Sequence, residues 1–240
     1  MFVCGEARAG AWPAADGEVL AILKYERSQS DESFDLDGER YGAVPRTDEA
    51  VSLHLEYGAS ERMTYQAKAA WTRGEDDGGG RYEGRGPVEL GVRYAWYEGD
   101  ATVVSSYVGV VWNGDGRNVG YADPGAGSTD WEGRILVGRS FEVRDRPAFI
   151  EAQAARLARA GLPDETRLDL TAGYEPSPKW LFLAQSYAGW TDAEPQWWKL
   201  EVSAVHRLGD WRLQAGWRGS VAGKAGPVEG GPVLGLWRGF

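Results

Sequence analysis

Apolar and polar residues alternate along most of this chain, beginning near Glu18. Residues 51–57 (VSLHLEY), 88–97 (VELGVRYAWY) and 211–218 (WRLQAGWR) show the pattern most clearly. Successive side chains of a strand point to opposite faces, so a period of two predicts strands with one apolar and one polar face. Residues 151–160 (EAQAARLARA) are rich in helix-favouring residues, but they follow Pro147 and lie between two strand patterns, so we also assign them as strand.

The alternating segments number twelve, and their approximate ranges are 18–28, 50–58, 62–73, 87–97, 101–112, 129–141, 147–157, 165–175, 179–190, 197–207, 211–221 and 230–240. Every second connection is short. The others are longer and lie at 29–49, 74–86, 113–128, 158–164, 191–196 and 222–229. Short turns at one end and long loops at the other are typical of membrane barrels. We therefore predict an all-β fold, a single antiparallel up-and-down transmembrane β-barrel of about 12 strands over residues 18–240.

The distribution of aromatic and charged residues indicates that the apolar face of this barrel points outward, into lipid. Tryptophans near the strand ends share the apolar face and are predicted to form interfacial belts: Trp71, Trp96, Trp112, Trp131, Trp180, Trp198 and Trp211. Charges of both signs share the polar face and are predicted to line the lumen: Lys68, Arg93, Glu132, Arg134, Glu151, Arg167, Asp169, Lys199, Glu201, Arg212 and Arg218. Strands of about ten residues also match a tilted crossing of the hydrocarbon layer.

Composition excludes several other classes of protein. The net charge of -10 argues against nucleic acid as a partner, because a phosphate backbone requires a basic surface. A single cysteine, Cys4, rules out an intramolecular disulfide framework, and two histidines are too few for a His-rich metal site. The acidic stretch 31–39 lacks the ligand spacing of a calcium loop and is interpreted as a solvated loop. We predict no cofactor and no metal.

The first 17 residues form an N-terminal segment before the first predicted strand. Ala7-Arg8-Ala9 has the small-x-small form of a signal-peptidase site, although the apolar core and basic region expected upstream are absent. One interpretation is a remnant of a signal peptide left by a wrongly chosen start codon. The other is an uninformative terminus.

The last strand ends on an aromatic residue, Phe240, with Leu236 and Leu234 in the same apolar register. Arg238 and Pro232 depart from this register. The ending resembles the C-terminal signal of Gram-negative outer-membrane β-barrel proteins. Residues 56–58 (EYG), 138–142 (GRSFE) and 234–238 (LGLWR) are similar to an uncharacterised proteobacterial group of them. The resemblance implies the cell outer membrane as location, the lipid bilayer and the barrel assembly machinery as partners, and Phe240 as assembly signal. It implies no activity.

Twelve strands enclose a lumen wider than that of an eight-stranded barrel and narrower than that of a sixteen-stranded porin. We expect a porin-like channel for transport of small polar or charged solutes, with mixed charges along the wall. Two alternatives stay open: a structural or envelope protein with a plugged lumen, and a soluble ligand-binding β-barrel. Outer-membrane phospholipases resemble the chain only in strand count. Ser52, His54 and Glu56 share one face but form no nucleophile motif, so we predict no enzyme and no catalytic residue.

Overall fold

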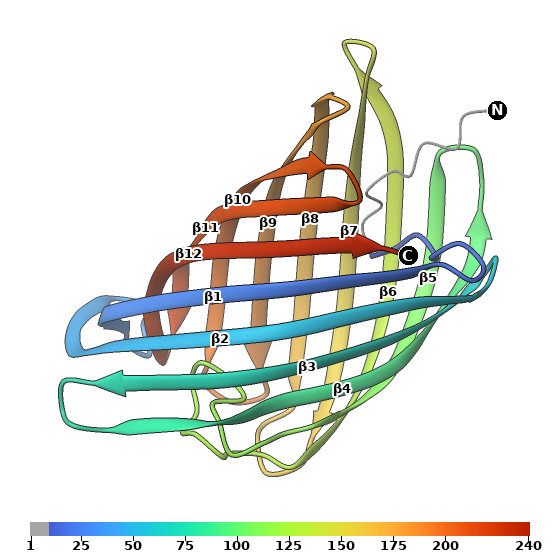
Figure 1. Cartoon of the computed structure of the whole chain (residues 1–240). Helices are drawn as coiled ribbons and strands as arrows, with labels where there is room; N and C mark the ends of the chain where they lie inside the picture. The colour runs from blue at the N-terminus through green and yellow to red at the C-terminus, as the bar shows by residue number, and fades with distance from the viewer. Residues whose placement is uncertain (1–9) are drawn as a thin grey trace.

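A computed structural model describes residues 10–240 and contains twelve strands that close into one antiparallel barrel (Figure 1). Each strand pairs with its neighbours in sequence, and the first pairs with the last, Leu20 opposite Gly239. The predicted fold class is therefore confirmed. The strands are β1 (Val19–Phe34), β2 (Arg40–Ser60), β3 (Met63–Asp76), β4 (Arg81–Glu98), β5 (Thr102–Trp112), β6 (Thr129–Val143), β7 (Arg146–Arg159), β8 (Glu165–Ser177), β9 (Trp180–Thr191), β10 (Gln196–Leu208), β11 (Trp211–Lys224) and β12 (Gly226–Gly239).

Several strands extend well beyond the alternating segments. Residues 40–49 belong to β2 and pair with β1, as in Glu32 opposite Gly42, and β12 follows β11 after Ala225 alone. The prediction of long loops at 29–49, 74–86 and 222–229 was therefore wrong. Strand residues beyond the hydrocarbon layer need no apolar face, so the period-two pattern weakens there while backbone pairing continues. The assignment of 151–160 was correct, since β7 reaches Arg159.

The outer surface of the barrel is apolar and the inner surface is polar. Leu53, Ile135 and Val202 are 41%, 63% and 62% exposed, although they lie in the middle of strands. On the inner face, Arg93 and Glu132 are only 1% and 3% exposed. A water-soluble protein buries its apolar side chains instead. This inversion confirms a transmembrane type of barrel and excludes the soluble ligand-binding alternative.

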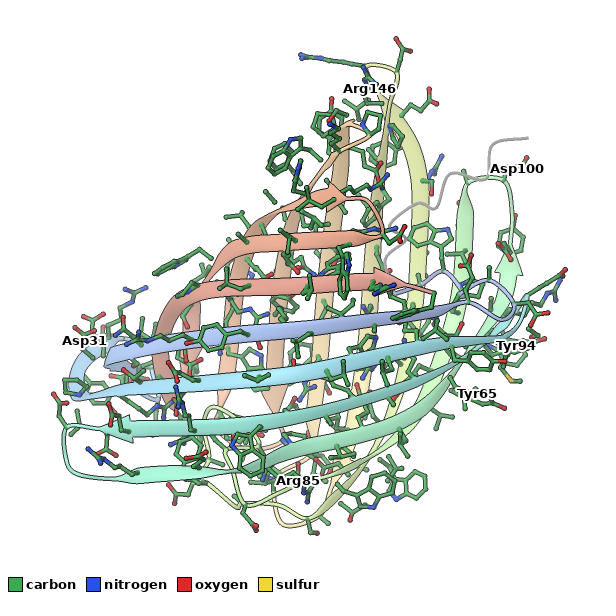
Figure 2. All side chains as sticks on the ribbon, viewed as in Figure 1. Asp31, Tyr65, Arg85, Tyr94, Asp100 and Arg146 are labelled. Atoms are coloured by element: carbon green, nitrogen blue, oxygen red, sulfur yellow. The ribbon has the colours of Figure 1, made fainter. Side chains whose placement is uncertain are left out.

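The seven tryptophans predicted for the membrane interface all lie on the outer face, 39–66% exposed. Those toward the long-loop end are Trp71, Trp112, Trp131 and Trp198, and those at the short-turn end are Trp96, Trp180 and Trp211. Their contact with lipid headgroups stays a prediction. Figure 2 shows the two ends, with Asp31 at one and with Asp100 and Arg146 at the other. No helix in residues 10–240 is long and apolar enough to cross a membrane.

Candidate functional site: the barrel lumen

The interior of the barrel contains a cavity of about 780 Å³ with polar and apolar side chains in its wall. Eight of the eleven charged residues predicted to face the lumen line this cavity: Lys68, Glu132, Arg134, Glu151, Arg167, Asp169, Lys199 and Arg218. The other three, Arg93, Glu201 and Arg212, do not line it. Arg93 and Glu201 are each 1% exposed, covered by other interior side chains. A contribution of any of the eleven to solute passage stays a prediction.

On one side of the lumen, Arg134 of β6 joins three strands. Its guanidinium contacts Glu89 of β4 at 2.5 Å and Glu132 of its own strand at 2.5 Å. Tyr107 of β5 donates its hydroxyl to Glu89 at 2.5 Å, and Arg134 lies 4.3 Å from the centre of the Tyr107 ring. Charge-assisted hydrogen bonds of this kind are stronger than neutral ones, so they hold the wall in place.

On another side, Arg218 of β11 has the corresponding role. It contacts Glu201 of β10 at 2.6 Å and Glu26 of β1 at 2.8 Å. Lys24 also contacts Glu26, at 3.1 Å, and Arg218 lies 4.7 Å from the Tyr187 ring centre. Glu201 therefore neutralises lumen cations from beneath the surface instead of facing the cavity itself.

At the long-loop end, the connection 113–128 folds into the barrel, and residues 117–121 line the cavity. Arg117 donates its Nε to Asp48 at 3.2 Å, and Arg46 donates to the Gly120 carbonyl at 3.3 Å. The Tyr121 ring stacks on Trp197, with 5.7 Å between ring centres. This loop therefore narrows the lumen at that end. The sequence pattern predicted a long loop here but not its inward direction.

A buried ion cluster lies beneath this loop, at the ends of β6, β7 and β8. Arg159 contacts both Asp130 and Glu165 at 3.0 Å, and the exposed fractions of these three side chains are 2%, 1% and 0%. Arg167 also contacts Glu165. Arg159 donates to the Tyr121 hydroxyl at 2.9 Å, and that hydroxyl donates to Glu165 at 3.1 Å. The cluster thus ties the loop to the wall.

At the short-turn end, the residues before β1 enter the barrel. Ala11 donates its backbone N–H to Glu151 at 2.6 Å and accepts from Ser105 Oγ at 2.6 Å. Arg93 donates to the Gly10 carbonyl at 2.5 Å, and Ala14 N donates to Thr64 Oγ1 at 2.9 Å. Arg93 and Glu151 therefore hold the N-terminal segment. The signal-peptide interpretation concerns Ala7–Ala9, which lie outside the described residues, and it stays a prediction.

Trp12 is the side chain that anchors this segment. It is 8% exposed and packs edge-to-face against Phe149 of β7, with 6.0 Å between ring centres. A Cβ atom at Gly138 would lie 2.5 Å from the Trp12 ring, so the ring fits only above a glycine. The sequence analysis did not predict that residues 10–14 insert into the barrel. The only signal for it was Trp12, a large aromatic residue outside any predicted strand.

His54 belongs to a polar network on the inner wall. Its Nε2 lies 3.1 Å from Glu56 Oε1, and Glu56 also accepts hydrogen bonds from Gln66 at 2.6 Å and from Arg93. Ser52 is buried on the same face. No group of three or more His, Cys, Asp or Glu side chains within residues 10–240 is arranged to hold a metal ion.

The C-terminal Phe240 is 67% exposed at the short-turn end, and its backbone pairs with Val19, closing the barrel. Arg238 lies between two outer aromatic rings, 4.6 Å from the centre of Trp211 and 4.8 Å from that of Phe240. This position explains the departure from the apolar register, because a guanidinium is favourable over aromatic faces at an interface.

The apolar exterior, closed barrel and polar lumen define an outer-membrane type of β-barrel, and comparison with solved structures supports this class. By sequence alone, no protein-family model and no curated protein matches the chain. An outer membrane channel from Pseudomonas putida F1 has a TM-score of 0.76 at 16% identity, with 98% of this chain and 100% of that one covered.

Two further solved structures are similar in fold. The KdgM porin has a TM-score of 0.58 at 7% identity, covering 91% of this chain and 99% of that one. The translocator domain of the autotransporter NalP from Neisseria meningitidis has a TM-score of 0.57 at 13% identity, covering 95% and 90%. At these identities the likeness establishes the fold, which is that of Gram-negative outer-membrane β-barrel proteins.

Proposed function

We propose that this protein is a porin-like channel of the cell outer membrane for small polar or charged solutes. The observation that carries the proposal is the charged cavity of about 780 Å³ inside a barrel whose outer surface is apolar. The volume is within the range of roughly 300–1,000 Å³ that is typical of small-molecule sites. The apolar exterior suits the lipid bilayer, where a closed barrel leaves no unpaired strand edge.

The similar solved structures support a channel more than an enzyme, since one is described as an outer membrane channel and another as a porin. The KdgM porin has also been solved with disordered oligogalacturonate, at a TM-score of 0.54 and 7% identity to this chain. The lumen described above pairs its arginines with carboxylates, as Arg134 does with Glu89. The wall is therefore not predominantly basic, as binding of an acidic polysaccharide would require. Its mixed charges suit small polar or charged solutes better.

Planar-bilayer conductance of the refolded full chain tests the proposal. We expect discrete conductance steps, and we expect Arg218→Gln to shift ion selectivity toward cations because a lumen cation is lost. Lys179→Gln, at an exposed short turn outside the cavity, is the matched control. Absence of conductance at every voltage, in protein that shows the heat-modifiable gel migration of a folded barrel, would contradict a channel.

The second candidate is a structural envelope protein with a plugged lumen. It is favoured by the two inserted segments, residues 10–14 at one end and 117–121 at the other. The same recordings distinguish the two functions. A plug predicts silence in the full chain even after the inserted N-terminal segment has been loosened.

Phe240 supports a further part of the proposal, recognition by the outer-membrane barrel assembly machinery. It is an exposed terminal aromatic that directly follows β12. We expect Phe240→Ser to lower the amount of folded protein in the outer membrane several-fold. Phe141→Ser is the control, because Phe141 is also exposed near the short-turn end but is not terminal. Equal membrane levels of the two variants would reject this role for Phe240.

A further inference from the structure

Most charged side chains in the cavity wall are already neutralised by a partner, but two in the middle of the wall are not. Among the described residues, no hydrogen bond or ion pair engages the Lys68 ammonium or the Asp169 carboxylate, and both groups line the cavity. Lys224 is likewise without a partner in residues 10–240, but it lies at the long-loop end of β11, beside Gly38. Lys224 lines the cavity too, so among residues 10–240 it is only the middle of the wall that offers one free cation and one free anion.

These two groups lie on different sides of the barrel. Lys68 is on β3 and Asp169 is on β8, five strands apart in one direction around the closed sheet and seven in the other. The curved wall between these strands is visible in Figure 1. A solute in the lumen can therefore face Lys68 with one end and Asp169 with the other.

The two free groups belong to one ring of charges. Lys68 acts electrostatically on Glu89 and Glu26. Asp169 experiences the field of Arg167 on its own strand first, and then those of Arg134 and Arg218. The ion pairs Arg134–Glu89 at 2.5 Å and Arg218–Glu26 at 2.8 Å fill the two arcs between the free groups. Around the lumen, the order is thus a free cation, an ion pair, a free anion and a second ion pair.

This arrangement discriminates between solutes by charge type. An ion that enters a narrow lumen loses part of its hydration, and only wall groups that are not already engaged replace it without breaking another pair. A simple anion is attracted by Lys68 but repelled by Asp169, and a simple cation experiences the reverse. A molecule that carries both charges is compensated by both groups at once.

We propose that the lumen selects small zwitterionic solutes of the amino-acid class, with Lys68 contacting the carboxylate and Asp169 the ammonium. The inference rests on the proposed channel function and gives it a substrate class. It uses residues that the sequence pattern placed on the inner face, but the distinction between free and paired charges comes from the three-dimensional contacts.

Liposome swelling at neutral pH tests the proposal with four related probes: zwitterionic glycine, anionic N-acetylglycine, cationic glycinamide and neutral N-acetylglycinamide. Each rate is divided by that of the neutral probe, which removes differences in the amount of protein. The variants are Lys68→Gln, Asp169→Asn and the charge swap Lys68→Asp with Asp169→Lys. Lys224→Gln is the control, since it removes a free cation at the rim and not in the ring.

We expect the relative rate of glycine to fall several-fold in Lys68→Gln and in Asp169→Asn, and to recover in the charge swap. Lys224→Gln should keep the rate of the unmodified chain. In a salt gradient, the reversal potential should move toward cation selectivity in Lys68→Gln and toward anion selectivity in Asp169→Asn. This second measurement needs only a few folded channels.

Two results would overturn the inference in distinguishable ways. If the neutral probe enters and the relative glycine rate is the same in all variants, the channel proposal stands and the zwitterion site fails. If none of the four probes enters liposomes that contain the folded full chain, the channel proposal fails and the zwitterion site fails with it.

Discussion

The two ends of the lumen are both narrowed by an inserted segment, but the segments are held in different ways. At the long-loop end, loop 113–128 is bounded by strands on both sides and is tied down by the buried charges of Asp130, Arg159 and Glu165. At the short-turn end, residues 10–14 lie just before β1. They are held by hydrogen bonds to backbone groups and by the Trp12 ring.

This difference predicts which end opens more readily. Removal of the loop from the lumen would break the Arg117–Asp48 ion pair and the hydrogen bonds of the Tyr121 hydroxyl to the buried cluster. Hydrogen bonds to charged groups contribute about 1.5–3 kcal/mol each, and the Tyr121 ring would also lose its stack on Trp197. Withdrawal of residues 10–14 breaks a few hydrogen bonds and exposes one aromatic ring. The bonds to the Arg93 and Glu151 side chains contribute about 1.5–3 kcal/mol each and the neutral ones about 1 kcal/mol, and no ion pair is lost. We therefore expect opening at the short-turn end, with the loop as the fixed constriction.

The largest effect is expected from Trp12→Ala. Loss of a buried tryptophan costs roughly 3–5 kcal/mol, enough to release the N-terminal segment from Phe149 and the wall. Single-channel conductance in planar bilayers should rise several-fold. Trp71→Ala, which removes an outer-face ring that is 52% exposed, should leave conductance unchanged. Equal conductance of Trp12→Ala and the unmodified chain would show that the segment does not limit passage.

A smaller but still substantial effect is expected from Arg159→Leu. Without the guanidinium, Asp130 loses its cation and Glu165 keeps only Arg167, so the free energy of unfolding should fall by about 3–5 kcal/mol. Denaturant unfolding in detergent measures this loss. Arg159→Lys keeps the charge but not the forked hydrogen bonds and should lose less. A loss below about 1 kcal/mol in Arg159→Leu would show that the ion cluster does not hold the loop more strongly than residues 10–14 are held.

The alternation of residues predicted the barrel and its orientation because lipid contact imposes a strict pattern on the outer face. The pattern ends where lipid ends, so residues 40–49 were assigned to a loop although their backbone continues the sheet. The inserted residues 10–14 bind through backbone groups such as Ala11 N, which any sequence supplies. They therefore leave almost no trace in the pattern.

The inner wall shows a second limit of sequence reasoning. A period of two indicates which side chains face inward, but not how deeply they lie among the others, so Arg93 was predicted to line the lumen although it is covered. The period of two also does not indicate which inward-facing charges form ion pairs with one another. Arg218 and Glu26 are distant in sequence, and only barrel closure brings them to 2.8 Å. The free state of Lys68 and Asp169 follows from such pairings and is visible only in three dimensions.

The smallest effect, and the one that refines the comparison of the two ends, is expected from Tyr121→Phe. The variant keeps the ring stacked on Trp197 but loses the hydroxyl, which donates to Glu165 and accepts from Arg159. A hydrogen bond to a charged group contributes about 1.5–3 kcal/mol, but Arg159 and Glu165 still contact each other, so a loss near 1 kcal/mol in unfolding free energy is expected. Tyr121→Ala, which also removes the stacked ring, should lose more and should widen the channel. If both variants conduct equally and more than the unmodified chain, the hydrogen bonds of the Tyr121 hydroxyl to the ion cluster position the loop. If only Tyr121→Ala conducts more, the ring against Trp197 forms the constriction itself.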